Sequence, residues 1–282
     1  MIADLMTYDF LRQTFLTGIL IGIIAPLLGT FIVVRRLSLI ADALSHVTLS
    51  GIAFSLFIEK KFAFYMLPPL YGGLLFSVLG SIFIEKLRSV YKAYQEIAIP
   101  IILSGGVGLS VIFIALADGF NTELMNYLFG SASAVSKSDF FTILIITVFV
   151  LFIITIFYKE LFTLSFDEEH SKVSGIHSKQ IHLLFIILTA LVIAGSIQIV
   201  GVLLVSALMT LPVAASMRIA KGFKQMMFLA IAFGELAVMI GLISGYYLNI
   251  PPGGTIVMVA IIILLLSIAY KRLQESKMGA KQ

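Results

Sequence analysis

Residues 35–51 read RRLSLIADALSHVTLSG, a stretch in which two arginines are followed by an apolar run that carries an aspartate and a histidine. Asp42 and His46 are four residues apart, just over one helical turn, so in a helix both side chains leave the same face. A carboxylate and an imidazole are costly in lipid, which makes the pair a candidate functional site. Hydrogen bonding to each other or to neighbouring helices is the alternative interpretation.

The composition around this stretch is that of a membrane protein. Of 282 residues, 60% are hydrophobic and 12% charged, and the mean hydropathy is +1.10, whereas about 25% of residues are charged in soluble domains. The chain has room for roughly eight to ten spans. Its excess of Lys and Arg (19) over Asp and Glu (15) is typical of cytoplasmic loops, not of a nucleic-acid surface. The absence of cysteine excludes disulfides and thiolate metal sites, and the N-terminus lacks the basic region of a cleaved signal peptide.

The apolar runs divide the chain into nine candidate spans. We read them as helices, because they are far longer than barrel strands and lack period-two alternation. Residues 1–13 form a mildly polar lead-in, and Gly195-Ser196-Ile197-Gln198 separates the sixth run from the seventh. The spans are expected at about 14–34, 37–57, 62–84, 97–117, 140–158, 181–194, 199–217, 225–248 and 255–270.

Loop charge indicates the orientation of these spans, because cytoplasmic loops are rich in Lys and Arg. If nine spans alternate, the N-terminus lies outside and the basic loops all lie inside; if either half of 181–217 is re-entrant, the count is eight. The loop 118–136 has no Lys or Arg, as expected outside, whereas Lys60 and Lys61 are exceptions. The basic loops that lie inside on this count are 35–36, 85–92, 159–179, 218–224 and 271–281.

We expect one membrane domain over 1–282.

A second motif lies in the longest basic loop, where residues 166–176 read FDEEHSKVSGI. Asp167, Glu168 and Glu169 stand where a helix N-terminus stabilises negative charge, and Gly175 suits the C-terminal stop of that helix. Glu169 precedes Gly175 by six residues, a spacing that resembles the Glu-Ala-Ala-three residues-Gly pattern of ABC importer permeases, whose coupling helix docks on an ATPase. A solvated charged loop is the alternative.

The remaining polar residues give weaker signals. The sequence has no Gly-x-x-x-x-Gly-Lys-Ser/Thr, so any ATP must be bound by another polypeptide, and no His-Glu-x-x-His. Glu235, near the middle of the eighth span, is either a functional carboxylate or a protonated helix-packing group. His170, His177 and His182 do not share one helical face and are expected at the surface or at an interface.

Taken in order, these motifs resemble one family. RRLSL at 35–39 with DALSH at 42–46 resembles the second-helix signature of the zinc and manganese ABC importer permeases, which are allied to the cobalamin and siderophore permeases. The chain departs from that pattern at Ala41, where glycine is common, at Ser50, where proline is frequent, and at Pro252-Gly253, where Ser-Gly is usual. Further matching segments are LFGS at 128–131, 166–176, GVLLVSAL at 201–208, YYLNIP at 246–251 and GTIV at 254–257.

The resemblance implies an all-α polytopic protein of the bacterial cytoplasmic membrane with the type II, cobalamin-permease-like fold. It implies a homodimer with a central path, two cytoplasmic ATPase subunits that bind ATP and dock on 166–178, and an extracellular metal-binding lipoprotein or periplasmic protein. The chain itself is expected to be no enzyme, to hold no covalent cofactor and to bind no nucleic acid. By resemblance, Asp42 and His46 hold the metal transiently and help gate the path.

The sequence leaves the ion and the energy source open. Imidazole favours Zn²⁺, but one histidine and one aspartate per chain also suit Mn²⁺. A self-contained proton-coupled metal transporter that uses Glu235 is the alternative function, and a membrane scaffold without transport is a third. Counting from Arg35-Arg36 places Asp42 and His46 within about 10 Å of the cytoplasmic end of a straight helix.

Overall fold

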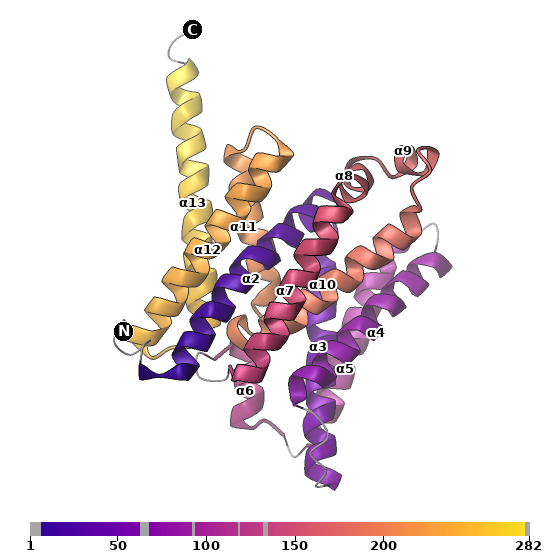
Figure 1. Cartoon of the computed structure of the whole chain (residues 1–282), viewed down its shortest axis with the longest axis vertical. Helices are drawn as coiled ribbons and strands as arrows, with labels where there is room; N and C mark the ends of the chain where they lie inside the picture. The colour runs from indigo at the N-terminus through magenta and orange to yellow at the C-terminus, as the bar shows by residue number, and fades with distance from the viewer. Residues whose placement is uncertain (1–6, 63–67, 92–93, 118, 132–134, 280–282) are drawn as a thin grey trace.

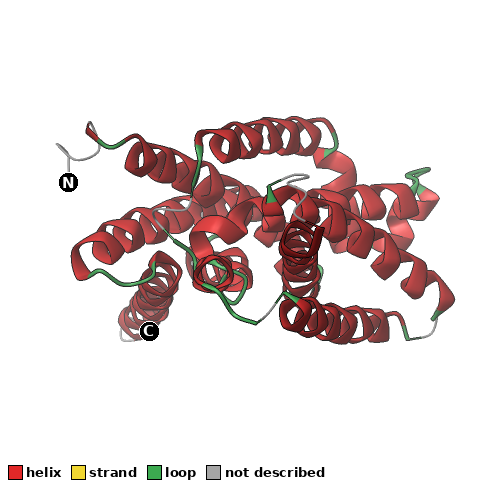
Figure 2. Cartoon of the chain, turned by 90° about the horizontal axis from the view of Figure 1, so that it is seen from below, coloured by secondary structure: helices red, strands yellow, loops and turns green. Residues whose placement is uncertain are grey.

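The computed structural model describes residues 7–62, 68–91, 94–117, 119–131 and 135–279. Within these ranges every regular element is a helix, as the colours of Figure 2 show, and the long helices run between the two ends of the molecule in Figure 1. The expected all-α fold is confirmed. The elements are α2 Asp9–Val34, α3 Leu39–Phe62, α4 Pro69–Val90, the 3-10 helix η1 Gln95–Ile97, α5 Ala98–Leu116, α6 Thr122–Phe129, α7 Lys137–Ile156, α8 Tyr158–Phe166, α9 Glu168–Val173, α10 Ser178–Val200, α11 Val205–Ile219, α12 Phe223–Leu248 and α13 Pro252–Gly279.

Eight of these helices are long and apolar enough to cross a membrane: α2, α3, α4, α5 together with η1, α7, α10, α12 and α13. The ninth apolar helix, α11, has only 15 residues, or about 22 Å at 1.5 Å per residue. It runs back toward the upper end in Figure 1 after α10 has come down, so the described chain starts at the lower end and finishes at the upper end. The region that the sequence left open between eight and nine spans thus holds one full-length span and one short helix.

The break before α11 is not where the sequence placed it. Gly195-Ser196-Ile197-Gln198 lies inside α10 and is buried, so the prediction of a break at these four residues is wrong. The chain turns instead at Gly201, whose φ of +87° is a conformation that favours glycine. Small and polar residues can remain in a membrane helix where neighbouring helices pack on them, and Gly195 faces Ile143 of α7 in this way.

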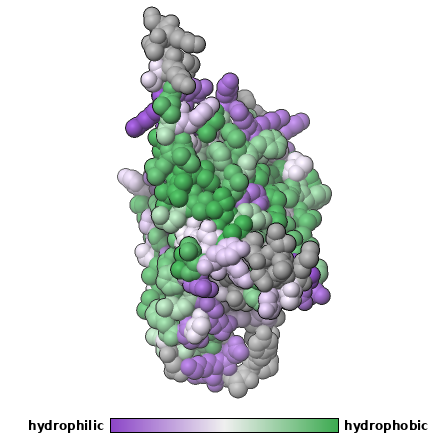
Figure 3. Space-filling model, turned by 90° about the vertical axis from the view of Figure 1, so that its left-hand side faces the viewer, coloured by the Kyte–Doolittle hydropathy of each residue, from purple (hydrophilic) through white to green (hydrophobic). Residues whose placement is uncertain are grey.

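Charged residues separate the two ends of the bundle. The helix ends and loops that carry most of the basic residues, including Arg35, Arg36 and Arg88, lie at the upper end in Figure 1, which we assign to the cytoplasm. Figure 3 shows a hydrophobic belt between two more hydrophilic ends. Arg12 at the start of α2 and Lys137 at the start of α7 also lie at the outer end, together with the two predicted exceptions. These two have local partners: Lys60 donates to the Ala117 carbonyl at 3.3 Å, and Lys61 lies over the Phe57 ring.

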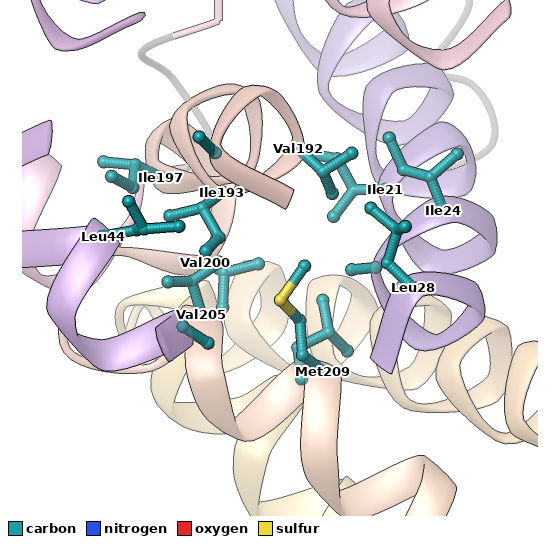
Figure 4. Packing of buried hydrophobic residues seen from close by; sticks show 14 of the residues in the cluster. Ile21, Ile24, Leu28, Leu44, Val192, Ile193, Ile197, Val200, Val205 and Met209 are labelled. Atoms are coloured by element: carbon teal, nitrogen blue, oxygen red, sulfur yellow. The ribbon is translucent and has the colours of Figure 1, made fainter. Parts of the chain in front are cut away.

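The core is formed by α2, α3, α10 and α11, which converge in the middle of the bundle. Side chains from these four helices point toward one another in Figure 4 and are almost completely buried. These helices are apolar on nearly all sides, so no apolar stripe selects which side of each helix is buried. The rotation of each helix about its axis is instead determined by close packing with its neighbours. The labelled residues are Ile21, Ile24, Leu28, Leu44, Val192, Ile193, Ile197, Val200, Val205 and Met209.

Three glycines join the connecting segments near the outer end. A Cβ on Gly130 would overlap the carbonyl oxygen of Ile199, one on Gly201 would lie 2.5 Å from the Leu128 oxygen, and one on Gly253 would overlap the Val200 oxygen. The segment after α6, the α10–α11 turn and the first turn of α13 therefore meet backbone to backbone. We call this contact of Gly130, Gly201 and Gly253 the glycine junction.

Candidate functional site

The aspartate–histidine pair lies at the cytoplasmic end of α3. Asp42 is in the first turn of this helix, which begins at Leu39 after a turn at residues 35–38. His46 follows one turn later, about 10 Å from the start of the helix along its axis. Both residues are partly buried, and within the described ranges neither side chain makes a hydrogen bond or a salt bridge. The two side chains thus present unused ligand atoms on one face of α3.

Helix α5 packs tightly against α3 at this pair. The Ser110 hydroxyl donates a hydrogen bond to the His46 carbonyl at 3.1 Å. A Cβ on Gly106 would stand 2.9 Å from the Val47 nitrogen and 3.1 Å from the His46 carbonyl carbon. Small residues permit such a close approach of two helix backbones in a membrane. The position of His46 therefore depends on its contact with α5.

Asp42 and His46 offer fewer ligands than a divalent ion takes. Carboxylate and imidazole bind manganese and zinc, but protein-bound ions of this kind have four or more ligands. In the part of the chain that the structure describes, no three His, Asp or Glu side chains are grouped so that they could hold a metal ion. A metal held by this pair would need further ligands from water or from a second copy of the chain.

Gly106→Ala is expected to displace α5 from α3 and to lower the free energy of unfolding by about 1–3 kcal/mol, because the new methyl group meets backbone. Gly254→Ala in α13 is the control, since an added Cβ there meets nothing within 4 Å. Thermal unfolding of the purified variants measures the difference. If the two variants unfold alike, α5 does not hold His46 through Gly106.

The acidic motif forms a short helical connection at the cytoplasmic end (Figure 1). Helix α9 begins at Glu168, and Gly175 follows it with φ +79°, the left-handed conformation of a helix stop. Asp167 and Glu169 are exposed, whereas the side chain of Glu168 lies outside the described part of the chain. The local arrangement is thus an exposed acidic helix start followed by a glycine stop.

This connection is tied to the beginning of α10. The backbone nitrogen of Ile176 donates to the Ser171 carbonyl at 3.1 Å, and the hydroxyls of Ser171 and Ser178 are 2.9 Å apart in a buried hydrogen bond. Because Ser178 is the first residue of α10, these bonds connect α9 directly to that membrane helix.

His182, one turn into α10, bridges two other helices. The Arg35 guanidinium donates to His182 Nδ1 at 2.5 Å, and since arginine can only donate, the remaining proton is on Nε2. That nitrogen lies 3.3 Å from the Glu85 carboxylate of α4, and Arg88 lies 3.6 Å from the same carboxylate. His182 is 6% exposed, so it is not a surface histidine, whereas His177 is exposed. This link could not be predicted from local sequence, because its members are far apart in the chain.

Glu235 lies in the middle of α12 against α2. Its Oε1 occupies the space that the missing side chain of Gly22 leaves: a Cβ on Gly22 would be 2.8 Å from that oxygen. The oxygen is buried and has no hydrogen-bond partner among the described residues. The interpretation of Glu235 as a helix-packing hydrogen bond is therefore not supported at Oε1. Within the described ranges, Glu235 belongs to no group of three or more His, Asp or Glu side chains that could hold a metal ion.

Eight long apolar helices and a partly buried polar pair are typical of a multi-pass membrane protein with a functional site inside the membrane. The chain belongs to the ABC 3 transport family, whose model matches residues 7–271. The predicted family is thereby confirmed.

Named relatives match nearly the whole chain. A "Probable metal transport system membrane protein" of Treponema pallidum is 34% identical over 94% of this chain and 97% of its own. The "Manganese import system permease protein ScaB" of Streptococcus parasanguinis is 34% identical over 94% and 92%. The solved structure titled "PsaBC from Streptococcus pneumoniae in complex with Fab" is 33% identical over 95% of both chains, with a TM-score of 0.81. The expected ABC-permease fold is confirmed.

Proposed function

We propose that this chain is the permease subunit of an ATP-driven importer of a divalent metal ion, with manganese as its cargo. The observation that carries the proposal is the Asp42–His46 pair: two metal-ligand groups one turn apart on a membrane helix, with no hydrogen bond or salt bridge within the described ranges. Leaving such groups unused in a membrane is costly unless they serve a passing ion. A site that binds through few protein ligands also releases its ion readily.

Manganese is favoured over zinc by the names of the relatives. Permeases of manganese transport are 31–34% identical to this chain over 94% of its length. The ligand chemistry alone does not decide, because one carboxylate and one imidazole suit either ion. We therefore favour manganese on the names of the relatives, although the imidazole of His46 by itself favours zinc.

A homodimer would complete the site. A second Asp42–His46 pair across a two-fold axis would raise the number of protein ligands to four. Helix α5, which packs on α3 at His46, has an outward surface where Gly105 and Gly108 meet nothing within 4 Å. Small residues on an uncovered helix face are typical of helix–helix contacts in membranes. We infer that the α3–α5 side of the chain faces the partner copy and the path between the two copies.

The ATPase subunits would act through α9. Its exposed acidic residues and its position at the cytoplasmic end suit a docking element, and the Ser171–Ser178 hydrogen bond ties it to α10. From α10, His182 reaches Arg35, seven residues before Asp42. Docking and release at α9 can thus shift the turn from which the metal-binding helix starts. Delivery of the ion from outside would be the task of a separate binding protein.

Uptake of radioactive manganese and zinc distinguishes this proposal from its alternative. In cells that depend on this chain and its partner subunits, we expect manganese uptake that disappears when the ATPase subunit is made inactive and that survives Glu235→Gln. A self-contained proton-coupled transporter predicts the opposite: uptake without the ATPase and its loss in Glu235→Gln. Zinc uptake without manganese uptake would overturn the choice of ion but not the mode of transport.

A further inference from the structure

A second polar site lies at the outer end of the bundle, far from Asp42 and His46. A cavity of about 250 Å³ opens between α6 and the last turn of α10. Glu123, Asn126 and Tyr127 of α6 and Gln198 of α10 line it. All four side chains end in oxygen-bearing groups, so the cavity offers oxygen ligands and no imidazole or thiolate.

Gln198 is the strongest indication that this cavity binds a ligand. The residue is 4% exposed, and its Oε1 is buried without a hydrogen-bond partner among the described residues. A buried acceptor left in this state costs about 1–3 kcal/mol. The backbone is firmly held, because the Gln198 carbonyl accepts a hydrogen bond from the Ser131 nitrogen at 3.0 Å. The side chain thus extends from a fixed backbone position and lines the cavity with an unused oxygen.

Helix α6 presents two more oxygen groups from the opposite side. Asn121 caps this helix by accepting from the Leu124 nitrogen at 2.8 Å, and Glu123 and Asn126, three residues apart, then share one face. Neither of these two side chains has a hydrogen bond or salt bridge within the described ranges. Burial, and next the charge of Glu59 at the end of α3, raise the pKa of Glu123. A cation between the helices would relieve the repulsion between the two carboxylates.

We propose that this cavity is an outer receiving site for a hard divalent cation such as Mn²⁺, with the Glu123 carboxylate and the amide oxygens of Asn126 and Gln198 as ligands. Oxygen-only ligand sets suit manganese, magnesium and calcium better than zinc. A single carboxylate with neutral amides and water binds weakly, as a receiving site requires. As a step in transport the proposal rests on the proposed function: Glu59 and Asp42 lie at opposite ends of α3, so one helix connects the two sites.

Binding of Mn²⁺ alone to the purified full-length chain in lipid nanodiscs tests the site. The background chain for this test carries Asp42→Asn and His46→Gln and therefore lacks the inner pair. Electron paramagnetic resonance then measures how much Mn²⁺ remains bound to it. We expect a residual site that Glu123→Gln or Gln198→Met weakens at least about tenfold, since loss even of an outer-shell partner costs 10–100-fold at metal sites. Glu96→Gln and Gln180→Met, both exposed near the cytoplasmic end, are the matched controls and should bind as the background does.

The outcomes separate this inference from the proposed function. If Mn²⁺ binding is absent in the background, or is unchanged by Glu123→Gln, the outer site is refuted even where manganese uptake depends on His46. If the residual binding depends on Glu123 and Gln198 while the parent chain takes up no manganese, the cation site stands and the proposed function falls. Because Gln198→Met alters a buried position, its unfolding temperature is compared with that of the background chain. If Gln198→Met does not fold, the test of the outer site rests on the Glu123→Gln result alone.

Discussion

Replacing Asp42 with asparagine or His46 with glutamine is expected to lower manganese uptake about 100-fold, because each change removes a direct ligand where loss of an outer-shell partner alone costs 10–100-fold. Both replacements preserve side-chain size approximately. Neither side chain makes a hydrogen bond or salt bridge within the described ranges, so the folded chain and its assembly with partner subunits should be unaffected. The measurement is uptake of radioactive manganese in cells, normalised to the amount of permease in the membrane.

Glu96→Gln is the control for this experiment. Glu96 is an exposed carboxylate in η1, and its loss should leave uptake unchanged. Near-normal uptake in both Asp42→Asn and His46→Gln would show that the ion passes elsewhere. A loss of uptake that is matched by a loss of membrane-inserted protein would instead assign the pair a structural role.

Gly253→Ala is expected to lower the free energy of unfolding by at least about 2–3 kcal/mol, because its methyl group would overlap backbone oxygen atoms that cannot move independently. A Cβ there would meet the Val200 oxygen and lie 2.6 Å from the Phe129 oxygen. By the scaling known for soluble proteins, the unfolding temperature would fall by roughly 5–10 °C. Thermal unfolding in detergent measures this effect.

The adjacent residue provides the control. A Cβ on Gly254 meets nothing within 4 Å, and alanine is the better helix former by about 1 kcal/mol. Gly254→Ala should therefore unfold at the same temperature as the parent chain or slightly above it. Equal unfolding of the two variants would contradict the account of the glycine junction, in which α13, the α10–α11 turn and the segment after α6 meet at their backbones.

The parts of the fold that local sequence dictates could be predicted. Long apolar runs located the membrane helices, although several ends were wrong by five to nine residues, as in α4 and α13. Loop charge indicated their direction. Both signals depend only on neighbouring residues. Counting turns from Arg35-Arg36 also placed Asp42 and His46 near the start of α3, where the structure has them. The family followed from the order of short motifs and was confirmed by the family model.

Features that depend on contacts between distant segments could not be predicted. Gly130 and Gly201 lie in motifs that resemble the family, and Gly253 lies between two others, yet nothing local indicates that the three glycines touch. The link from Arg35 to His182 spans 147 residues, and a histidine beside a charged loop reads as a surface residue. The segment 195–198 was predicted to be a break between two spans, because the neighbouring helices that bury it could not be known from the sequence.

The central claim is that Asp42 and His46 bind the transported ion, and pulsed electron paramagnetic resonance of Mn²⁺ on the purified chain tests it most directly. A nitrogen-14 coupling from a bound imidazole is expected in the parent chain and should be absent in His46→Gln, while the oxygen-only outer site contributes none. Bound Mn²⁺ without nitrogen coupling in the parent chain, or with a coupling that persists in His46→Gln, would contradict the account.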